Sequence, residues 1–241
     1  MPIVVGRRPV EEALRGQRDV KVVHVADNAP DNPVCQQILA LCDAREIPVI
    51  FEPRPVLDKL SQGSRHQGIV AEVAAYKYHQ VSDLIEATSA QSQALIIALD
   101  HVVDPQNYGA IIRTAVAAGA DGIVVARERA APVSPAVVRA AAGATERAMV
   151  AQGNLSQALD QLKSASYWVI GADAAAQDLV WDVDLAGKVV FVFGSEGSGL
   201  SRLVAKKCDM KARIPLASGM DSLNVSVAAA IMIYEAIRQR R

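Results

Sequence analysis

The stretch VVFVFGSEGSGLS, residues 189–201, joins an unbroken apolar run to a loop with three glycines. An apolar run of this length is typical of a strand that is buried on both faces, as in a parallel sheet covered by helices. Gly194, Gly197 and Gly199 let the backbone turn tightly and let a ligand approach it closely. The stretch therefore predicts an α/β fold with a binding loop at the carboxyl end of one strand.

The glycine spacing separates this loop from two common nucleotide-binding loops. It is G-x-x-G-x-G, whereas the dinucleotide fingerprint is G-x-G-x-x-G, and no lysine follows as in a phosphate-binding loop. A Rossmann-type enzyme also needs an acidic residue at a strand end about 20 residues on, where Asp209 is too near and Asp221 falls in a loop. A Rossmann enzyme and a plain strand-to-helix turn remain as alternatives. Glu196 favours a functional loop, because a carboxylate at the end of a buried strand needs a partner.

The chain around this loop alternates apolar strands with helices, which predicts one parallel sheet covered on both faces. Gly119 is expected to end one helix, and Ser134 (followed by Pro135) and Asn154 to begin two others. The predicted strands are 94–100, 122–126, 168–173, 188–194 and a short one within 211–217; the predicted helices are 107–118, 134–146, 154–166 and 221–241.

The first part of the chain predicts a small α/β unit of its own. Strands are expected at 21–27, 48–53 and 68–73, and helices at 32–47 and 55–62. Asp31 or Asn32 is the expected N-cap of the first helix. Cys35 and Cys42 share one face of that helix, so we expect them in the core. The expected domains are 1–75 and 94–241, joined by a polar linker, 76–93, that holds one or two helical turns.

Composition sets the outer limits. Of 241 residues, 51% are hydrophobic and 21% charged, with a formal net charge of −1, so bulk charge does not indicate a nucleic-acid partner. The cysteines lack metal-site spacing, and neither a membrane span nor a secretory signal is evident, so we expect a cytoplasmic protein without a metal. Basic residues form local clusters that either bind RNA or are merely solvated helix faces: Arg7, Arg8, Arg15 and Arg18; Lys206 and Lys207; Arg238, Arg240 and Arg241.

Three polar loops follow predicted strands, namely residues 100–109, 194–199 and 215–224. Because ligands bind at the carboxyl ends of parallel strands, we expect these loops to converge on one site. Asn107 and Asn224 are candidate site residues, although each is also a plausible helix N-cap. Arg113 lies outside the apolar stripe of its helix, so it is either a surface residue or a partner for a phosphate or for a carboxylate.

Together the three loops resemble the motifs of the SpoU family of RNA ribose methyltransferases, which belong to the knotted methyltransferase superfamily. The motifs appear here as DPQNYGAIIRTAVAAGADGIVV (104–125), VVFVFGSEGSGLS (189–201) and IPLASGMDSLNVSVAAAIMIYEA (214–236). The resemblance implies a parallel-sheet domain with a deep trefoil knot near its C-terminus. It further implies RNA as substrate, S-adenosylmethionine as cofactor and a homodimer with its active site near the subunit interface.

The resemblance also implies roles for named residues. The backbone at Gly194, Ile214 and Leu223 would hold the adenine and ribose of S-adenosylmethionine. The family assigns activation of the ribose 2′-hydroxyl to the motif-one arginine, here Arg113. Because a guanidinium has a pKa above about 12, we expect Arg113 to grip the RNA phosphate, to orient the hydroxyl and to accept its proton only late.

Three further side chains complete the implied catalytic set. Asn107 would position Arg113 or the ribose, Glu196 would fix Arg113 or the loop, and Asn224 would bind the substrate or brace the loop. Two alternatives keep the fold but change the function: a tRNA ribose methyltransferase and a non-catalytic RNA-binding factor in ribosome assembly.

The first 75 residues carry a second resemblance, through GRRPVEEAL (6–14) and HQGIVAEV (66–73). These segments resemble the small ribosomal-protein-like RNA-binding domain fused to one branch of the family. That branch methylates a guanosine ribose in 23S rRNA, which is therefore the expected substrate. A tRNA target and an antibiotic-resistance rRNA target stay open.

Overall fold

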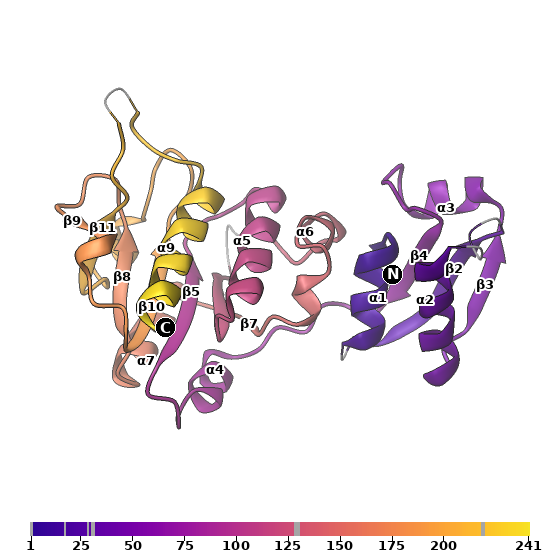
Figure 1. Cartoon of the computed structure of the whole chain (residues 1–241), viewed down its shortest axis with the longest axis horizontal. Coiled ribbons are helices and arrows are strands. Elements are labelled where there is room, and N and C mark those ends of the chain that lie inside the picture. Colours follow the sequence, from indigo (N-terminus) through magenta and orange to yellow (C-terminus); the bar gives the residue numbers. More distant parts are fainter. Residues whose placement is uncertain (1, 17, 28, 30–31, 128–130, 218–219) are drawn as a thin grey trace. The chain divides into compact units, whose positions relative to one another are not determined.

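The computed structural model describes residues 2–16, 18–27, 29, 32–127, 131–217 and 220–241 (Figure 1). By its internal contacts the chain divides into two compact units. The N-terminal unit comprises Met1–Lys77 with Pro132–Arg147, and the C-terminal unit comprises Tyr78–Ala131 with Ala148–Arg241. Among the described residues, no helix combines the length and the apolar character needed to cross a bilayer.

The N-terminal unit is built on a four-stranded sheet in the order β1-β4-β2-β3. Strand β4 runs antiparallel to β1 and to β2, whereas β2 and β3 are parallel. The strands are β1 (Ile3–Val5), β2 (Val20–Ala26), β3 (Val49–Glu52) and β4 (Ile69–Val73), and the helices of the first 77 residues are α1 (Arg7–Arg15), α2 (Pro33–Ala44) and α3 (Arg54–Leu60). A small α/β unit is therefore confirmed.

Helix α2 matches its prediction closely. The side chain of Asn32 accepts a hydrogen bond from the Val34 backbone N–H at 3.0 Å, so Asn32 is the N-cap, whereas Asp31 lies outside the described residues. Cys35 and Cys42 are fully buried, as expected for core residues. Helix α1 and strand β1 were not predicted.

Residues Pro132–Arg147 pack within the N-terminal unit, although their sequence gives no sign of it. Ser134 caps α6 (Pro135–Ala140), as predicted, and a short 3-10 turn follows at Ala144–Glu146. Arg18 Nη1 lies 2.8 Å from Glu146 Oε1, and only 7% and 3% of these side chains are exposed. Since a buried charge is costly without a partner, each residue of this ion pair depends on the other.

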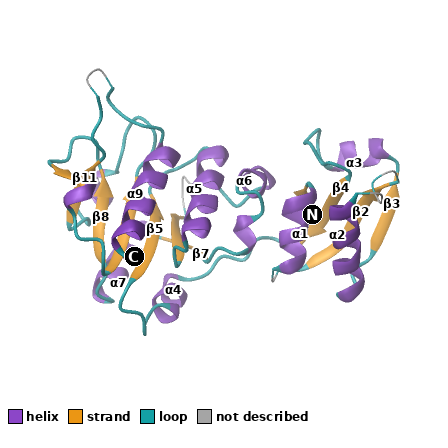
Figure 2. Ribbon diagram, viewed as in Figure 1, coloured by secondary structure: helices purple, strands orange, loops and turns teal. Residues whose placement is uncertain are grey.

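The C-terminal unit contains a seven-stranded sheet in the order β7-β6-β5-β10-β8-β11-β9. Figure 2 draws its strands in orange. Every neighbouring pair runs parallel. The strands are β5 (Ala94–Leu99), β6 (Gly122–Ala126), β7 (Val150–Gly153), β8 (Trp168–Ala172), β9 (Asp178–Leu179), β10 (Lys188–Phe193) and β11 (Met210–Arg213). The predicted parallel sheet is confirmed, although β7 and β9, which are short, were missed.

Helices cover both faces of this sheet. On one face, α4 (Val81–Ala87), α7 (Leu155–Ser164) and α8 (Arg202–Ala205) contribute to a core cluster with alternate residues of β5 and β10. On the other face, α5 (Pro105–Ala118) and α9 (Val225–Gln239) lie side by side (Figure 1). Helix α4 lies within the predicted linker, where one or two helical turns were expected.

Strands β5 and β10 lie at the topological switch point of the sheet, where the chain connections lead outward in opposite directions. Strand β5 pairs with β10, with Leu99 opposite Phe193, while β6 and β8 lie outward on opposite sides. The loops that follow β5 and β10 therefore begin next to each other, at the carboxyl ends of these strands. A crevice at such a point is where open parallel sheets bind their ligands.

Candidate active site

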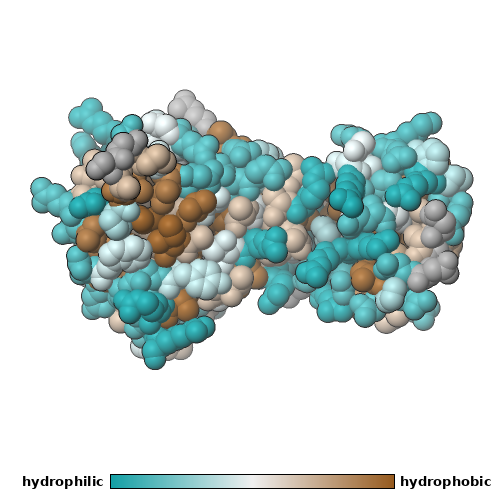
Figure 3. All heavy atoms as spheres, turned by 45° about the horizontal axis from the view of Figure 1, so that its top comes forward, coloured by the Kyte–Doolittle hydropathy of each residue, from teal (hydrophilic) through white to brown (hydrophobic). Residues whose placement is uncertain are grey.

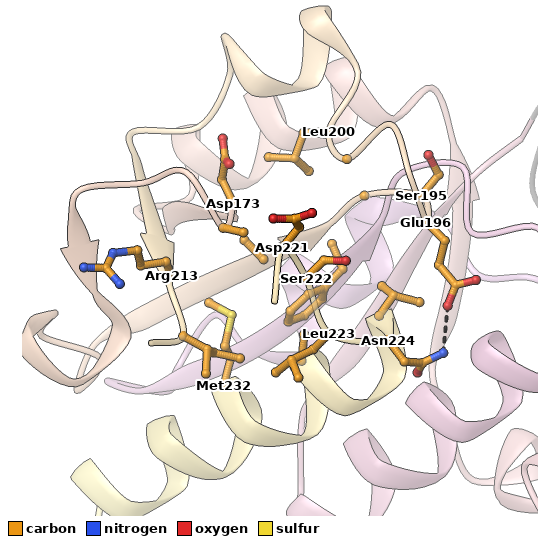
Figure 4. A pocket seen from close by; sticks show the side chains of 18 of the residues that line it. Asp173, Ser195, Glu196, Leu200, Arg213, Asp221, Ser222, Leu223, Asn224 and Met232 are labelled. Carbon is orange, nitrogen blue, oxygen red and sulfur yellow. Dashed lines mark hydrogen bonds between the residues drawn. The ribbon is translucent and has the colours of Figure 1, made fainter. Parts of the chain in front are cut away.

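The loops after β8, β10 and β11 and the start of α9 surround a cavity of about 670 Å³ (Figure 4). This volume lies within the roughly 300–1,000 Å³ of small-molecule sites. Apolar side chains form much of its wall, including Leu200, Leu216, Leu223, Val225 and Met232. The expected convergence of the second and third loops is thus confirmed.

The glycine loop folds back on itself. Ser195 N donates to Gly199 O at 3.1 Å, and Gly199 N donates to Ser195 O at 3.0 Å. Gly197 and Gly199 have φ of 90° and 65°, in the left-handed region that favours glycine. A Cβ on Gly194 would lie 2.1 Å from the carbonyl carbon of Gly199. Position 194 therefore has to be glycine, because the backbone at Gly199 folds back against it.

Three predicted residues form one hydrogen-bonded trio beside this loop. Asn107 Nδ2 donates to Glu196 Oε1 at 2.9 Å, and Asn224 Nδ2 donates to the same oxygen at 2.7 Å. Asn224 Nδ2 also lies 2.9 Å from Asn107 Oδ1, which accepts from it. We name these residues the amide–carboxylate trio. It joins the three sequence motifs through their side chains.

The helix that carries Asn107 begins earlier than predicted. Asp104 is the N-cap, since its side chain accepts from Gln106 N at 3.1 Å, and Pro105 occupies the first turn. The interpretation of Asn107 as an N-cap is therefore wrong. With 7% of its surface exposed, Asn107 instead directs its amide at Glu196. The expected end of this helix at Gly119, which has φ of 79°, is confirmed.

Asn224 serves both as a cap and as a member of the trio. Its Oδ1 accepts from the Ser226 and Val227 backbone N–H groups at 2.9 and 3.4 Å, which caps α9. Its Nδ2 is then free to point at Glu196 (Figure 4). The sequence left open whether Asn224 is a helix N-cap or a site residue, and its side-chain amide serves as both.

Arg113 is an exposed residue of α5, six positions after Asn107. In the described part of the chain its guanidinium has no hydrogen bond or ion pair, and Glu196 is held by the two amides instead. The sequence allowed Glu196 to fix either Arg113 or the loop, and its bonds go to the trio. The exposed cationic side chain of Arg113 is thus available to an external anion.

The three predicted cofactor residues, Gly194, Ile214 and Leu223, all line the cavity. Sequence reasoning missed Asp173 and Lys211 in the same wall. Lys211 Nζ donates to Asp173 Oδ2 at 2.8 Å, and this hydrogen bond lowers the pKa of Asp173 and raises that of Lys211. Asp173 directly follows β8, so the rule that ligands bind at strand ends could have found it.

The charges in the wall suit a zwitterionic cofactor with an additional positive charge. Asp173 and Lys211 neutralise each other, so the remaining charges of the wall are Glu196 and Asp221, which can face a cation, and Arg213, which can face a carboxylate. The apolar wall and the glycine backbone suit a flat heteroaromatic ring, whose edge backbone groups can bind. S-adenosylmethionine combines these features, so the residues present fit it. In the described ranges, no group of three or more His, Cys, Asp or Glu side chains could hold a metal ion.

A buried acid anchors the glycine loop from behind. Asp100 follows β5 and only 1% of it is exposed. Its Oδ2 accepts from Ser201 N at 2.6 Å, and its Oδ1 lies 2.6 Å from His101 Nδ1. The end of the glycine loop is therefore tied to the neighbouring strand end, which holds the cavity wall in place.

Family models match most of the chain. The model described as "SpoU rRNA Methylase family" covers residues 94–234, and "RNA 2'-O ribose methyltransferase substrate binding" covers residues 3–79. The chain belongs to the SpoU family. A Bacillus subtilis relative, "Putative TrmH family tRNA/rRNA methyltransferase YacO", is 38% identical over 98% of this chain and 95% of that protein.

Solved structures of SpoU proteins agree with this fold. The AdoMet-bound rRNA methyltransferase from Sinorhizobium meliloti matches with a TM-score of 0.83 and 30% identity over 98% of this chain and 86% of that one. AviRb from Streptomyces viridochromogenes, solved with AdoMet, matches with a TM-score of 0.84 and 25% identity over 99% and 89%. S-adenosylmethionine as the cofactor of the family is thereby confirmed, as is the expected RNA methyltransferase family.

Proposed function

We propose that this SpoU protein transfers a methyl group from S-adenosylmethionine to the ribose 2′-hydroxyl of a guanosine in 23S rRNA, in the cytoplasm. The observation that carries this proposal is the amide–carboxylate trio at the rim of a cavity that fits the cofactor. The trio gives the rim fixed polar groups on one side of that cavity, where a ribose can be oriented. Fixed orientation of two reactants contributes about 7–11 kcal/mol to rate enhancement in favourable cases.

The cofactor supplies an electrophilic methyl group, and the chain supplies position and charge. We assign Gly194, Ile214 and Leu223 to holding its adenine and ribose through backbone groups. Glu196 Oε2 has no hydrogen-bond donor among the described residues, so it can accept from a substrate hydroxyl while Oε1 stays engaged by the amides. Asn107 and Asn224 then act by holding that carboxylate in place.

We assign Arg113 to the RNA phosphate next to the target ribose. A guanidinium binds phosphate through paired N–H donors, and this one has no competing partner in the described part of the chain. Bound in that way it orients the 2′-hydroxyl; to take the hydroxyl proton late in the transfer, the side chain must first give one of its own protons to solvent, because a charged guanidinium has no lone pair. Because a guanidinium holds its proton strongly, the phosphate contact is the larger part of this role.

An rRNA substrate is favoured by the N-terminal unit. The TrmH/SpoU tRNA modifying enzyme from A. aeolicus covers only 66% of this chain, whereas the rRNA methyltransferase from Sinorhizobium meliloti covers 98%. In this proposal, residues 1–75 bind RNA, residues 94–241 carry out the transfer, and 76–93 link them. The trefoil knot and the guanosine target stay predictions from the resemblance.

A homodimer is favoured by the outer face of α9. Val227, Ala230, Ile231 and Tyr234 recur at helical spacing, and Val227 and Tyr234 are 46% and 50% exposed. We name these four residues the α9 stripe. Apolar side chains gather on the surface of the C-terminal unit in Figure 3. An apolar stripe on a solvent-facing helix is a surface that a second subunit can cover.

The direct test is to map ribose methylation in cells that lack the gene. Nucleoside-resolution mass spectrometry should find one 2′-O-methylguanosine missing from 23S rRNA, and purified protein with S-adenosylmethionine should restore it. A missing methyl in tRNA would replace the proposed substrate with tRNA. Intact methylation of both RNAs, together with a defect in subunit assembly, would identify a non-catalytic assembly factor and refute the proposal.

A further inference from the structure

The N-terminal unit has a cavity of its own, of about 480 Å³. Arg7, from the start of α1, Arg54, from the start of α3, and Arg65, from the loop before β4, all line it. We name this feature the arginine cleft. Among the described residues, no Phe, Tyr or Trp lines the cleft, and its other members are mostly polar or glycine.

The positive charge of the cleft is not neutralised within the described residues. None of the three arginines has an acidic partner within ion-pair distance there, whereas Arg15 pairs with Glu11 and Arg18 with Glu146. The basic cluster that the sequence grouped at residues 7–18 is therefore split, with Arg15 and Arg18 engaged and Arg7 turned to the cleft.

The one acid among the described lining residues, Asp58, is already engaged. Its Oδ1 lies 2.9 Å from His66 Nε2. His66 Nδ1 accepts from Gly68 N at 3.1 Å, so Nε2 carries the ring proton and donates it to Asp58. His66 is buried, with 3% of its surface exposed. The histidine therefore fixes the loop and draws the carboxylate away from the arginines.

The loop before β4 is built with strained backbone. Gln62 and Gln67 have φ of 50° and 53°, each followed by a glycine that is also in the left-handed region. Arg7 Nε donates to Gln67 O at 3.1 Å, which seats the guanidinium at the rim of the cleft. Strain held by hydrogen bonds next to a polar cavity is typical of a preformed binding site.

We propose that Arg7, Arg54 and Arg65 bind the phosphodiester backbone of the substrate RNA; this rests on the proposed function. Several guanidiniums without carboxylate partners match the charge and the oxygen geometry of phosphate. An apolar peptide would need apolar pockets, whereas the described lining of the cleft is mostly polar or glycine. Among the described residues, no Phe, Tyr or Trp lines the cleft and His66 is buried, so no ring is offered for bases to stack on; the cleft therefore holds the RNA in register without reading its sequence.

The test uses the full chain with the double substitution R54A/R65A. A matched control, R15A/K21A, removes the same charge from residues of the same unit that are ion-paired at its surface, Arg15 with Glu11 and Lys21 with Asp19. Filter binding of transcribed 23S rRNA, over a series of salt concentrations, measures Kd for both variants. Melting temperature and the Kd for S-adenosylmethionine, measured beside it, report whether each variant is folded.

We expect R54A/R65A to raise the Kd for RNA at least about tenfold and to lower the slope of log K against log salt by roughly one to two, as for the loss of two phosphate contacts. In methyl transfer, KM for RNA should rise while kcat is kept. An RNA affinity and a salt slope equal to those of R15A/K21A would overturn the inference. If wild-type protein transfers no methyl group but R54A/R65A still loses RNA affinity, the proposed function fails while the cleft stands.

Discussion

Asn107 Nδ2 donates a hydrogen bond to Glu196 Oε1 at 2.9 Å, although 89 residues separate the two in the chain. The same oxygen accepts from Asn224, so one carboxylate atom joins three sequence motifs. A bond of this kind is stronger than one between neutral groups, because the acceptor is charged. The trio therefore serves both as a structural link and as a fixed element of the site.

The substitution Glu196→Ala should lower kcat/KM by about 100-fold and reduce the free energy of unfolding by about 1–3 kcal/mol, since the buried amide of Asn107 loses its acceptor. Chemical denaturation and methyl-transfer assays measure the two effects. Glu196→Gln keeps an oxygen at the position that accepts both bonds. Because a neutral oxygen accepts more weakly than a carboxylate, it should lose some stability, but less than Glu196→Ala, and it should lose activity. A loss of stability equal to that of Glu196→Ala would contradict this account of the trio.

The substitution Arg113→Ala should reduce methyl transfer by at least about 100-fold, because it removes a phosphate contact and the orientation of the hydroxyl. Its melting temperature should be unchanged, since the side chain is exposed and unpartnered within the described residues. Arg202→Ala, another exposed arginine of the same unit, is the control and should stay active. Near-normal turnover by folded Arg113→Ala would remove Arg113 from the reaction.

The substitution Gly194→Ala should abolish binding of S-adenosylmethionine. The new Cβ would overlap the Gly199 backbone, which costs roughly 3 kcal/mol or more. A melting temperature lower by about 5–10 °C is expected for a chain of this size. Gly187→Ala is the matched control, because its Cβ would meet no atom within 4 Å. Calorimetric titration with the cofactor should separate the two variants, and equal binding by both would contradict the loop geometry.

Burial raises the pKa of Cys42 and of Cys208 to about 11 each. Near pH 8 the thiolate fraction of each is then on the order of one in a thousand, and the thiolate is the reactive form. Both thiols should react with a disulfide reagent at least about tenfold more slowly in the folded protein than in guanidinium. Rapid labelling of either thiol in the native state would refute this.

The same shifts set a direction for stability against pH. Because folding disfavours the thiolate, the unfolded chain ionises first as the pH rises above about 9. Stability from these thiols is thus complete below that pH and is lost between about 9 and 11. Cys42→Ala should flatten this part of the unfolding curve, which denaturant titrations along a pH series can measure.

If the α9 stripe is the dimer interface, Tyr234→Asp should produce monomers. A buried carboxylate without a partner is costly, whereas the exposed tyrosine tolerates change in a lone subunit. Light scattering should report half the wild-type mass, with circular dichroism unchanged. Leu203→Asp is the matched control, because Leu203 is also an exposed apolar residue, on α8 at the other face of the sheet, and it should leave the mass as in wild type.

The strands that carry the site could be predicted because they are long apolar runs. Strand β10 and the central β5 are buried on both faces, and their sequences have no polar interruption. Strands β7 and β9 were missed because they are short and partly polar, and the packing of Pro132–Arg147 in the N-terminal unit depends on the distant partner Arg18.

The sequence predicted that the loops converge on one site, but it did not predict the hydrogen bonds of the trio. The strand-end rule brings the second and third loops together, whereas the trio depends on where α5 begins. Asp104 and Pro105 repeat the cap-then-proline pattern that correctly located the start of α6 at Ser134 and Pro135. That pattern, applied to α5, would have placed Asn107 inside the helix.

One side chain, Asn224, both starts α9 and completes the trio. Inserting or deleting a single residue at this junction would rotate the amide by about 100° around the helix axis and carry it away from Glu196. The junction thus has a fixed length, and a helix grafted from another protein must keep asparagine at its cap to restore the site. Loops at the amino-terminal ends of the parallel strands hold no residue of the trio, so a tag or a label is better attached there.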